Sequence, residues 1–502
     1  MSAEMVSEDR SKRGTAGAVE VGRRWLRVLA ISVLLLVPCV WHQRIEAGDL
    51  GSHVYNAWLA QQIKHDQAPG LYLVRQWHNV MFDMALEHAA KLLGWAAAEK
   101  TVVGAAVLIF FWGAFAFVGA AAKREPWELA PALAMVAYGW TFQMGFLNYY
   151  ISLGLAFWSA ALLWRGRGWQ RMLAVALLPA VWLAHPLGIL WLVATVAYIW
   201  VHERIPGWYR LILPVAAVLA LAGTRWHVAR HFHYQADWVE APFYLFNGAD
   251  QLALLGKRYV ILAAAVFVLC AAVFVSEAAR RGVKWAGWKA LAVPLEMYFV
   301  AACAAGLLPQ NLTVPLYPSA MGLLVSRMTT VTAVLGLCLL AAIGMRSRIW
   351  ATLGLTACAA VYFAFLYQDT AALNRLAAEA ERLVSALPPG QRVVATIDAP
   401  QESRVPFLNH VVDRACVGRC FSYGNYEPAS KQFRVRVREG SPVAASSADD
   451  AENMATGDYE VQDENLPMFE IYQCDARDWT KLCIHSLGAG EENGQIGNDV
   501  SK

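Results

Sequence analysis

The chain has 502 residues, of which 58% are hydrophobic and only 16% are charged, with a formal net charge of +3. Its mean hydropathy is +0.37. This composition excludes a disordered chain, a collagen-like fibre and an ordinary soluble enzyme, and the balanced charge gives no indication of a nucleic-acid partner. We therefore expect an α-helical polytopic membrane protein that is embedded in the lipid bilayer.

The apolar runs predict eleven membrane crossings, because each crossing needs about 20 mostly apolar residues. The first run follows Arg23 and Arg24 and has no small-residue cleavage site after it, so it is read as a retained anchor rather than a signal peptide. The third and fifth runs are short enough to be re-entrant instead. The predicted crossings are 25–41, 102–122, 129–142, 148–164, 172–184, 187–201, 211–226, 259–275, 290–308, 319–343 and 349–367.

The distribution of Lys and Arg predicts the orientation. Basic residues occur in the N-terminal tail 1–24 and in alternate loops, whereas the turns near residues 143, 185 and 315 carry none. Loops rich in Lys and Arg stay in the cytoplasm. The membrane domain 25–369 thus leaves the loop 42–100 and the tail 370–502 outside, and we expect a bacterial inner membrane.

The first outer loop, 42–100, has helical apolar spacing. Leu50, Val54 and Trp58 form one stripe, and Met81 and Leu92 belong to another. The Ala-Pro-Gly sequence at 68–70 separates them. The pattern predicts two amphipathic helices that lie on the membrane surface.

The tail, 370–502, is predicted to be a small α/β or mostly β domain outside the membrane. A helical linker at 374–386 precedes strand-like runs at 392–397, 433–437 and 469–473. Arg434, Arg436 and Arg438 are expected on a solvated strand face. The segment 441–465 contains seven acids and no base, which is typical of a mobile loop.

Four of the nine cysteines lie in this tail: Cys416, Cys420, Cys474 and Cys483. An even number of cysteines in an oxidising compartment predicts disulfides, and the shortest loops join Cys416 to Cys420 and Cys474 to Cys483. A four-thiolate zinc site is the alternative, although the usual C-x2-C spacing is missing.

Asp49 is the first candidate for chemistry, because it directly follows the first crossing. His53 stands four residues later, where it shares a helix face with Asp49 and can orient or tune its charge. The alternative is structural: Asp49 caps the helix that begins there, since Asp is a favoured N-cap.

Three sequence segments carry a family resemblance: Gly48-Asp49-Leu50-Gly51-Ser52-His53, Gly145-Phe146-Leu147-Asn148-Tyr149 and Ala184-His185-Pro186. With the topology of residues 25–370, they resemble the GT-C glycosyltransferases, and in particular bacterial members related to the dolichyl-phosphate-mannose and aminoarabinose transferase group.

The resemblance implies that Asp49 is the general base of an inverting transfer from a polyprenyl-phosphate sugar to a lipid, glycan or protein acceptor of the cell envelope. Many family members place a second acid in the next outer loop, where this chain has Asn148. That departure puts a metal-bridged site with a divalent cation in doubt. Asp83, with His78 nearby, is the alternative second polar group.

The leaving phosphate needs cations on the outer side. Arg327 lies within the tenth predicted crossing, and an ionisable residue there marks a functional site unless it snorkels to the headgroups. Lys257 and Arg258 are candidates for contact with the donor, with interface anchoring as the alternative. His185 is either a cavity-lining residue or a structural histidine. No spacing predicts a metal site.

A membrane glycosyltransferase is therefore the function expected from the sequence. A secondary transporter is the alternative by topology, although the chain lacks the internal repeat typical of transporters. A non-catalytic scaffold in envelope assembly is the second alternative, because the second acid is missing.

Overall fold

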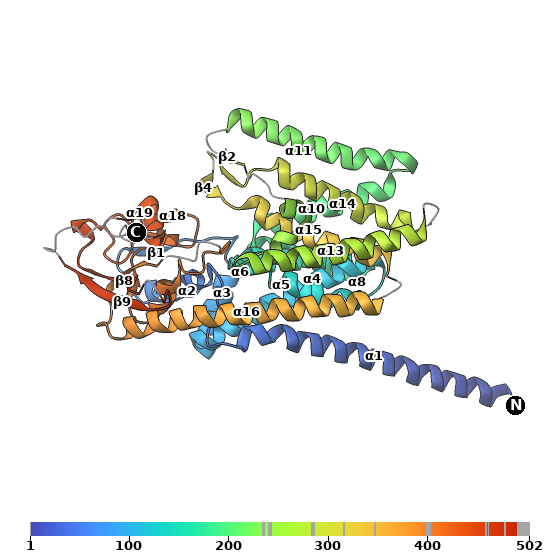
Figure 1. The fold of residues 1–502 in the computed structure, drawn as a ribbon, viewed down its shortest axis with the longest axis horizontal. Helices are drawn as coiled ribbons and strands as arrows, with labels where there is room; N and C mark the ends of the chain where they lie inside the picture. Colours follow the sequence, from blue (N-terminus) through green and yellow to red (C-terminus); the bar gives the residue numbers. More distant parts are fainter. Residues whose placement is uncertain are drawn as a thin grey trace.

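The computed structural model describes residues 2–232, 236–238, 243–282, 287–314, 317–345, 348–397, 403–456, 459, 461–475 and 478–488. The chain is mostly helical. Figure 1 shows a bundle of long helices at one end of the molecule and a smaller mixed domain at the other, with α16 (Arg348–Ser385) running through both.

Within the described residues, eight helical segments are long and apolar enough to cross a membrane, so the expectation of a polytopic membrane protein is confirmed at this level. They are α4 (Trp95–Ala122), α7 (Leu147–Arg165), α10 (Pro186–Arg204), the segment of η2 (Gly207–Leu211) and α11 (Ile212–His231), α13 (Lys257–Arg281), α14 (Trp288–Leu307), α15 (Leu324–Ile343) and α16 from Ile349.

The first predicted crossing belongs to α1 (Ser2–Val40), which packs on α4 and accepts a hydrogen bond at Ser32 Oγ from Trp112 Nε1 at 3.0 Å. In Figure 1 the N-terminal part of α1 projects beyond the bundle. The predicted linker at 374–386 is not separate from the last crossing, because α16 is one continuous helix of 38 residues.

The third and fifth predicted crossings are not single spanning helices. The eight residues of α5 are only about 12 Å long, well short of the hydrocarbon thickness. The third run is divided into η1 (Trp127–Leu129), α5 (Ala130–Ala137) and α6 (Trp140–Gln143), and the fifth into α8 (Trp169–Ala176) and α9 (Leu178–Ala184).

The tenth predicted crossing begins later than expected, at the start of α15. The residues before it form β4 (Tyr317–Met321), which pairs with β3 (Asn311–Val314), and β3 pairs with β2 (Ala236–Asp237). Two short helices, α12 (Phe243–Asn247) and η4 (Ala249–Leu252), precede α13.

The first outer loop contains the two expected helices, α2 (Leu50–Lys64) and α3 (Met81–Leu93). However, α2 does not lie on a surface: every residue from Leu50 to Ala60 is buried. The tail packs on it through α17 (Val411–Ala415), and α3 packs on it from within the same loop. Helix α3 buries Asp83 together with Phe82 and Leu86 and exposes Leu92, so its buried face is not purely apolar.

The tail forms a four-stranded sheet of order β6-β5-β8-β9, and the three predicted runs contain strands β5, β7 and β8. Its residues 489–502 lie outside the described part of the chain. The strands are β5 (Arg392–Thr396), β6 (Phe421–Ser422), β7 (Val435–Val437), β8 (Met468–Gln473) and β9 (Leu482–Leu487). Strand β7 pairs instead with β1 (Leu71–Leu73), which ties the tail to the first outer loop.

Two expectations for the tail are wrong. The acidic segment contains α19 (Ala448–Thr456) and η5 (Asp463–Asn465), and it buries Ala451 and Met454, so it is not simply a loop. Residues 457, 458 and 460 of it lie outside the described part. Arg434 is mostly enclosed and pairs with Glu87, with Nη1 2.8 Å from Oε2, whereas Arg438 is exposed as expected.

Both predicted disulfides are confirmed: Cys416 pairs with Cys420, and Cys474 pairs with Cys483. The first pair follows α17, and the second closes the turn between β8 and β9. The zinc alternative is therefore wrong for these four thiols.

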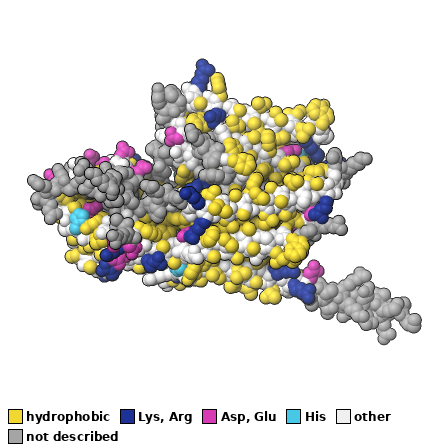
Figure 2. Space-filling model, viewed as in Figure 1, with side chains coloured by type: hydrophobic (Ala, Val, Ile, Leu, Met, Phe, Trp, Pro, Cys, Tyr) yellow, Lys and Arg dark blue, Asp and Glu magenta, His cyan; other side chains and the backbone are white. Residues whose placement is uncertain are grey.

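Figure 2 shows that hydrophobic side chains cover much of the long-helix part on the face in view, whereas charged side chains gather near the ends of that part. Helix α11 is mostly exposed: of the residues in the most apolar stretch of Gly207–His231, only 6% are buried inside the protein. An apolar surface of this extent needs a lipid environment.

Candidate functional site

Asp49 lies between the membrane helices and the tail, at the N-terminus of α2. Its backbone N–H donates to Met144 O at 2.9 Å, but its side chain makes no capping hydrogen bond to α2. The carboxylate side chain is 21% exposed. The carboxylate is thus available for contact with a ligand, and the capping interpretation does not account for it.

Three glycines allow the chain to pack tightly around Asp49. A Cβ on Gly48 would lie 2.8 Å from Met144 O, and one on Gly145, which has φ +79°, would lie 2.5 Å from the Asp49 nitrogen. A Cβ on Gly51 would collide with His410 O. Two of the sequence segments that carry the family resemblance therefore meet at Asp49, and the tail closes over them.

His410 of the tail connects Asp49 to a second carboxylate. Its Nε2 lies 3.8 Å from Asp49 Oδ1, and its Nδ1 lies 2.7 Å from Asp413 Oδ2. Asp413 also accepts a hydrogen bond from Ser422 Oγ. Burial lowers the pKa of His410, but the hydrogen bond to Asp413 and the nearby carboxylates outweigh burial and raise the pKa above its ordinary value. A protonated His410 places a positive charge beside Asp49.

His53 does not orient Asp49 directly, as the sequence suggested, but pairs with Asp83. His53 Nδ1 lies 2.7 Å from Asp83 Oδ1, and Asn148 Nδ2 donates to Asp83 Oδ2 at 2.8 Å. Burial opposes the charge on His53, but Asp83 outweighs it and raises the pKa of His53 to about 9. Asn148 also accepts from the N–H of Phe82 at 2.8 Å, which fixes the start of α3. Asp83 and Asn148, two of the predicted site residues, are thus in contact.

Glu427 adds a further buried acid from α18 (Glu427–Ser430). It accepts a hydrogen bond from Ser52 Oγ at 2.8 Å. Burial raises the pKa of Glu427 to about 7, against the opposing effect of His53. Glu427 and His410 were both missed in the sequence, where neither stands near a recognised motif.

Arg327 lies near the start of α15, close to Asp49. Its guanidinium carbon is 4.0 Å from the centroid of the Phe146 ring, and it interacts electrostatically with Asp49. Among the described residues, its buried Nε has no hydrogen-bond partner. The Arg327 side chain is therefore partly buried beside Asp49 rather than extended to the headgroups.

His185 has a structural role at the turn between α9 and α10. Its Nδ1 accepts from the N–H of Leu187 at 3.1 Å and so caps α10. It also packs edge-on against Tyr149, with ring centroids 5.5 Å apart, and Tyr149 donates to Arg327 O at 3.0 Å. His78 lies nearby with its ring 6.0 Å from that of Trp182.

Lys257 and Arg258 begin α13. Arg258 forms an ion pair with Asp369 of α16 and lies over Phe365, 4.7 Å from its centroid. Tyr259 also donates to Asp369, at 2.7 Å. Arg258 is thus used to join α13 to α16, and Lys257 is exposed at the same helix end.

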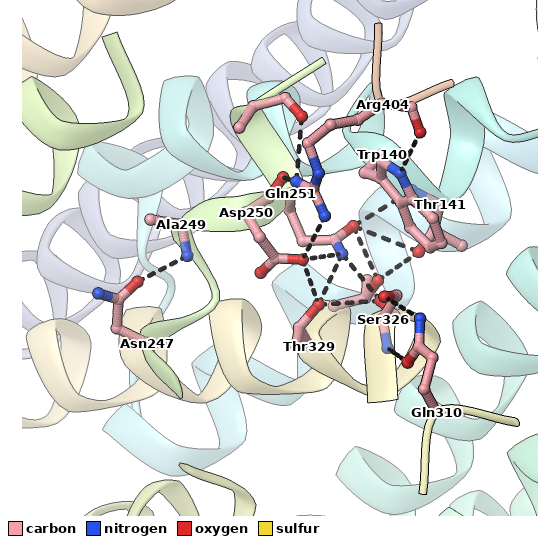
Figure 3. Close-up of polar contacts among 12 residues, drawn as sticks. Trp140, Thr141, Asn247, Ala249, Asp250, Gln251, Gln310, Ser326, Thr329 and Arg404 are labelled. Atoms are coloured by element: carbon pink, nitrogen blue, oxygen red, sulfur yellow. Dashed lines mark hydrogen bonds and ion pairs between the residues drawn. The ribbon is translucent and has the colours of Figure 1, made fainter. Parts of the chain in front are cut away.

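A second buried polar network, which the sequence analysis missed, joins η4 to α15 and the tail (Figure 3). Thr329 Oγ1 donates to Asp250 Oδ2 at 2.6 Å, and Gln251 Nε2 donates to Thr329 Oγ1 at 2.9 Å. Arg404 Nη1 donates to Asp250 O at 2.8 Å. The Asp250 side chain is fully buried, and burial raises its pKa to about 7. The network fixes the segment around Arg404 against the membrane helices.

Among the described residues, no group of three or more His, Cys, Asp or Glu is arranged to hold a metal ion. The residues around Asp49 form instead a cluster of carboxylates, two histidines and one arginine. Such a cluster can accept a proton at Asp49 and neutralise an anion at Arg327.

Comparison of the chain with protein-family models, with curated proteins and with solved structures finds no match.

Proposed function

We propose that this protein is an integral-membrane glycosyltransferase that moves a sugar from a polyprenyl-phosphate donor to an acceptor, with inversion at the anomeric carbon. The observation that carries the proposal is the environment of Asp49. Its side chain is partly exposed, makes no capping hydrogen bond and lies 3.8 Å from His410, with Arg327 in electrostatic contact.

In the proposed reaction, Asp49 takes the proton of the acceptor hydroxyl. The acceptor oxygen forms a bond to the anomeric carbon as the bond from that carbon to the phosphate oxygen breaks. The polyprenyl phosphate leaves with the bonding electron pair, so atoms and charge balance without a co-reactant. The base must be ionised to accept the proton, and His410, whose pKa is raised beside Asp413, lies 3.8 Å from it.

Arg327 is the proposed partner of the leaving phosphate. Its guanidinium is always charged and suits bidentate phosphate binding, and its buried Nε has no partner among the described residues. Burial strengthens an electrostatic contact with a phosphate, because little water competes for it. The aromatic ring of Phe146 holds the guanidinium in place.

Asp83 is the proposed substitute for the acid that the second outer loop lacks. Asn148, at the start of α7, donates to Asp83 at 2.8 Å, and this contact supports Asp83 as the second acid of the site. His53 pairs with the same carboxylate, which gives Asp83 a positioning role rather than a role as a second base.

The proposal is tested with purified full-length protein in detergent. We would supply undecaprenyl-phosphate-linked mannose, glucose and 4-amino-4-deoxyarabinose, each with a radiolabelled sugar, and measure the release of undecaprenyl phosphate with envelope lipids as acceptor. Arg327→Gln, which removes the positive charge and keeps a hydrogen-bond donor, should lower turnover by roughly 100-fold. Binding of a donor with no turnover by wild type would instead favour the non-catalytic scaffold.

A further inference from the structure

A second site lies at the far end of the membrane helices, away from Asp49. The N-terminal end of α4 faces the tail, where Glu99 pairs with Arg414, and its C-terminal end at Ala120 lies on the opposite side. There α1, α4 and α7 line an open cavity of about 720 Å³. This volume is in the range of sites for molecules the size of a drug or a lipid headgroup with part of its chains.

The walls of this cavity combine positive charge with aromatic rings. Arg24, Lys123, Arg124 and Arg165 line it together with one acid, Glu125, so the lining carries a net charge of +3. Its apolar walls include the tryptophans Trp25, Trp112, Trp127 and Trp158. A site that has both features recognises an amphiphile with an anionic head.

Among the described residues, three of the four cations that line the cavity lie close to carboxylates, and the fourth, Lys123, does not. Arg24 pairs with Glu125 at 2.6 Å, and Arg124 pairs with Glu128. Arg165 donates to Ala120 O at 3.0 Å and lies 4.0 Å from Glu203.

Within the described part of the chain, the ammonium of Lys123 has no hydrogen-bond or ion-pair partner. Lys123 is the left-handed residue that ends α4, with φ +56°. Its side chain lines the cavity.

We propose that this cavity binds one anionic glycerophospholipid from the leaflet opposite the tail. The phosphate diester lies against Lys123, with Arg165 beside it, and an acyl chain lies along Ala116 between Trp112 and Trp158. A zwitterionic lipid is disfavoured because its ammonium would meet the same excess positive charge. This inference does not depend on the proposed glycosyl transfer.

Native mass spectrometry of the full-length protein tests the proposal, with phosphatidylglycerol and phosphatidylcholine of matched chains in the detergent. We expect wild type to retain phosphatidylglycerol preferentially. Lys123→Gln should weaken that binding about fivefold, because one basic residue near a membrane surface contributes about 1 kcal/mol. Lys289→Gln is the matched control, since Lys289 is exposed at the same end of the helices and does not line the cavity.

Ala116→Leu tests the chain-binding part without changing charge, because the larger side chain fills the apolar wall. We expect it to reduce phosphatidylglycerol binding while the melting temperature stays near that of wild type. Equal retention of the two lipids by wild type, or an equal loss in Lys123→Gln and Lys289→Gln, would overturn the proposal. Displacement of the lipid by millimolar glycerol 3-phosphate would show a free-anion site and would also overturn it.

Discussion

His410 Nε2 lies 3.8 Å from Asp49 Oδ1, although one residue belongs to the first outer loop and the other to the tail. This relationship makes the tail part of the site rather than an appendage. Gly51 permits it, because any side chain there would collide with the His410 carbonyl. The Asp413 carboxylate, 2.7 Å from His410 Nδ1, raises the pKa of the imidazole that lies beside Asp49.

His410→Gln should act through Asp49 rather than through folding alone. The imidazole contacts Asp49 from the tail, and its loss leaves the carboxylate without that contact. We expect kcat to fall by roughly tenfold with little change in KM, because a misplaced base is a poorer proton acceptor. An unchanged kcat together with a lower melting temperature would assign His410 a purely structural role.

Stability at high pH should depend on the His53–Asp83 pair. The pKa of His53 is raised from 6.5 to about 9. The contribution of protonated His53 to the free energy of unfolding is therefore complete below pH 6.5 and is lost as the pH rises through 9. At 1.36 kcal/mol per pKa unit, this contribution is about 3 kcal/mol. The melting temperature of wild type should therefore fall between pH 7 and 9.5.

Asp83→Asn removes the carboxylate that is the main cause of the raised pKa of His53. We expect this variant to melt lower than wild type at pH 7 and to show a flatter profile up to pH 9.5. If the melting temperature of Asp83→Asn fell with pH as steeply as that of wild type, a group other than His53 would be the cause of the fall.

Asp250 should make stability change in a different pH window. The raised pKa of Asp250 means that the folded protein holds a proton more tightly than the unfolded chain. The contribution of protonated Asp250 to the free energy of unfolding is therefore present at low pH and is lost as the pH rises from about 4 to 7. Asp250→Asn stays neutral throughout. The melting temperature of this variant, relative to wild type, should rise between pH 5 and 8.

Asp66→Asn is the matched control for Asp250→Asn, because Asp66 is exposed in the loop after α2. It should track wild type at every pH. A constant difference in melting temperature between Asp250→Asn and wild type would contradict the assignment of the raised pKa to Asp250.

The orientation of the chain remains a prediction from its basic loops. Alkaline phosphatase fused after Ala386, just beyond the end of α16, should be active, and a reporter that works only in the cytoplasm should be inactive at the same position. The opposite pattern would place the tail and Asp49 on the cytoplasmic side.

The long crossings could be predicted from sequence because hydropathy reports directly on burial in lipid, as in α4 and α13. The third run was counted as a crossing with a re-entrant segment as the alternative, because hydropathy does not show that the chain turns at Gly139 between α5 and α6. Burial of α2 was missed for a related reason: a surface helix was assumed, although α2 is largely buried and covered by the tail.

The candidate site was predicted only where its residues lie near a motif. Asp49 and Arg327 stood out because polar groups beside or inside apolar runs are costly, whereas Asn148 and Asp83 were considered because of the family resemblance. His410 is brought to Asp49 by long-range packing, which one sequence does not show. The spacing of three residues between His410 and Asp413 was the available signal, because it places both side chains on one side of a helical turn.

The most direct test of the central claim is sugar transfer by Asp49→Asn, which keeps the size of the side chain and removes proton acceptance. With a donor that wild type uses, this variant should bind the donor normally, melt near wild type and transfer sugar at least about 100-fold more slowly, whereas Asp66→Asn should be unaffected. Near-normal transfer by a folded Asp49→Asn protein would contradict the account.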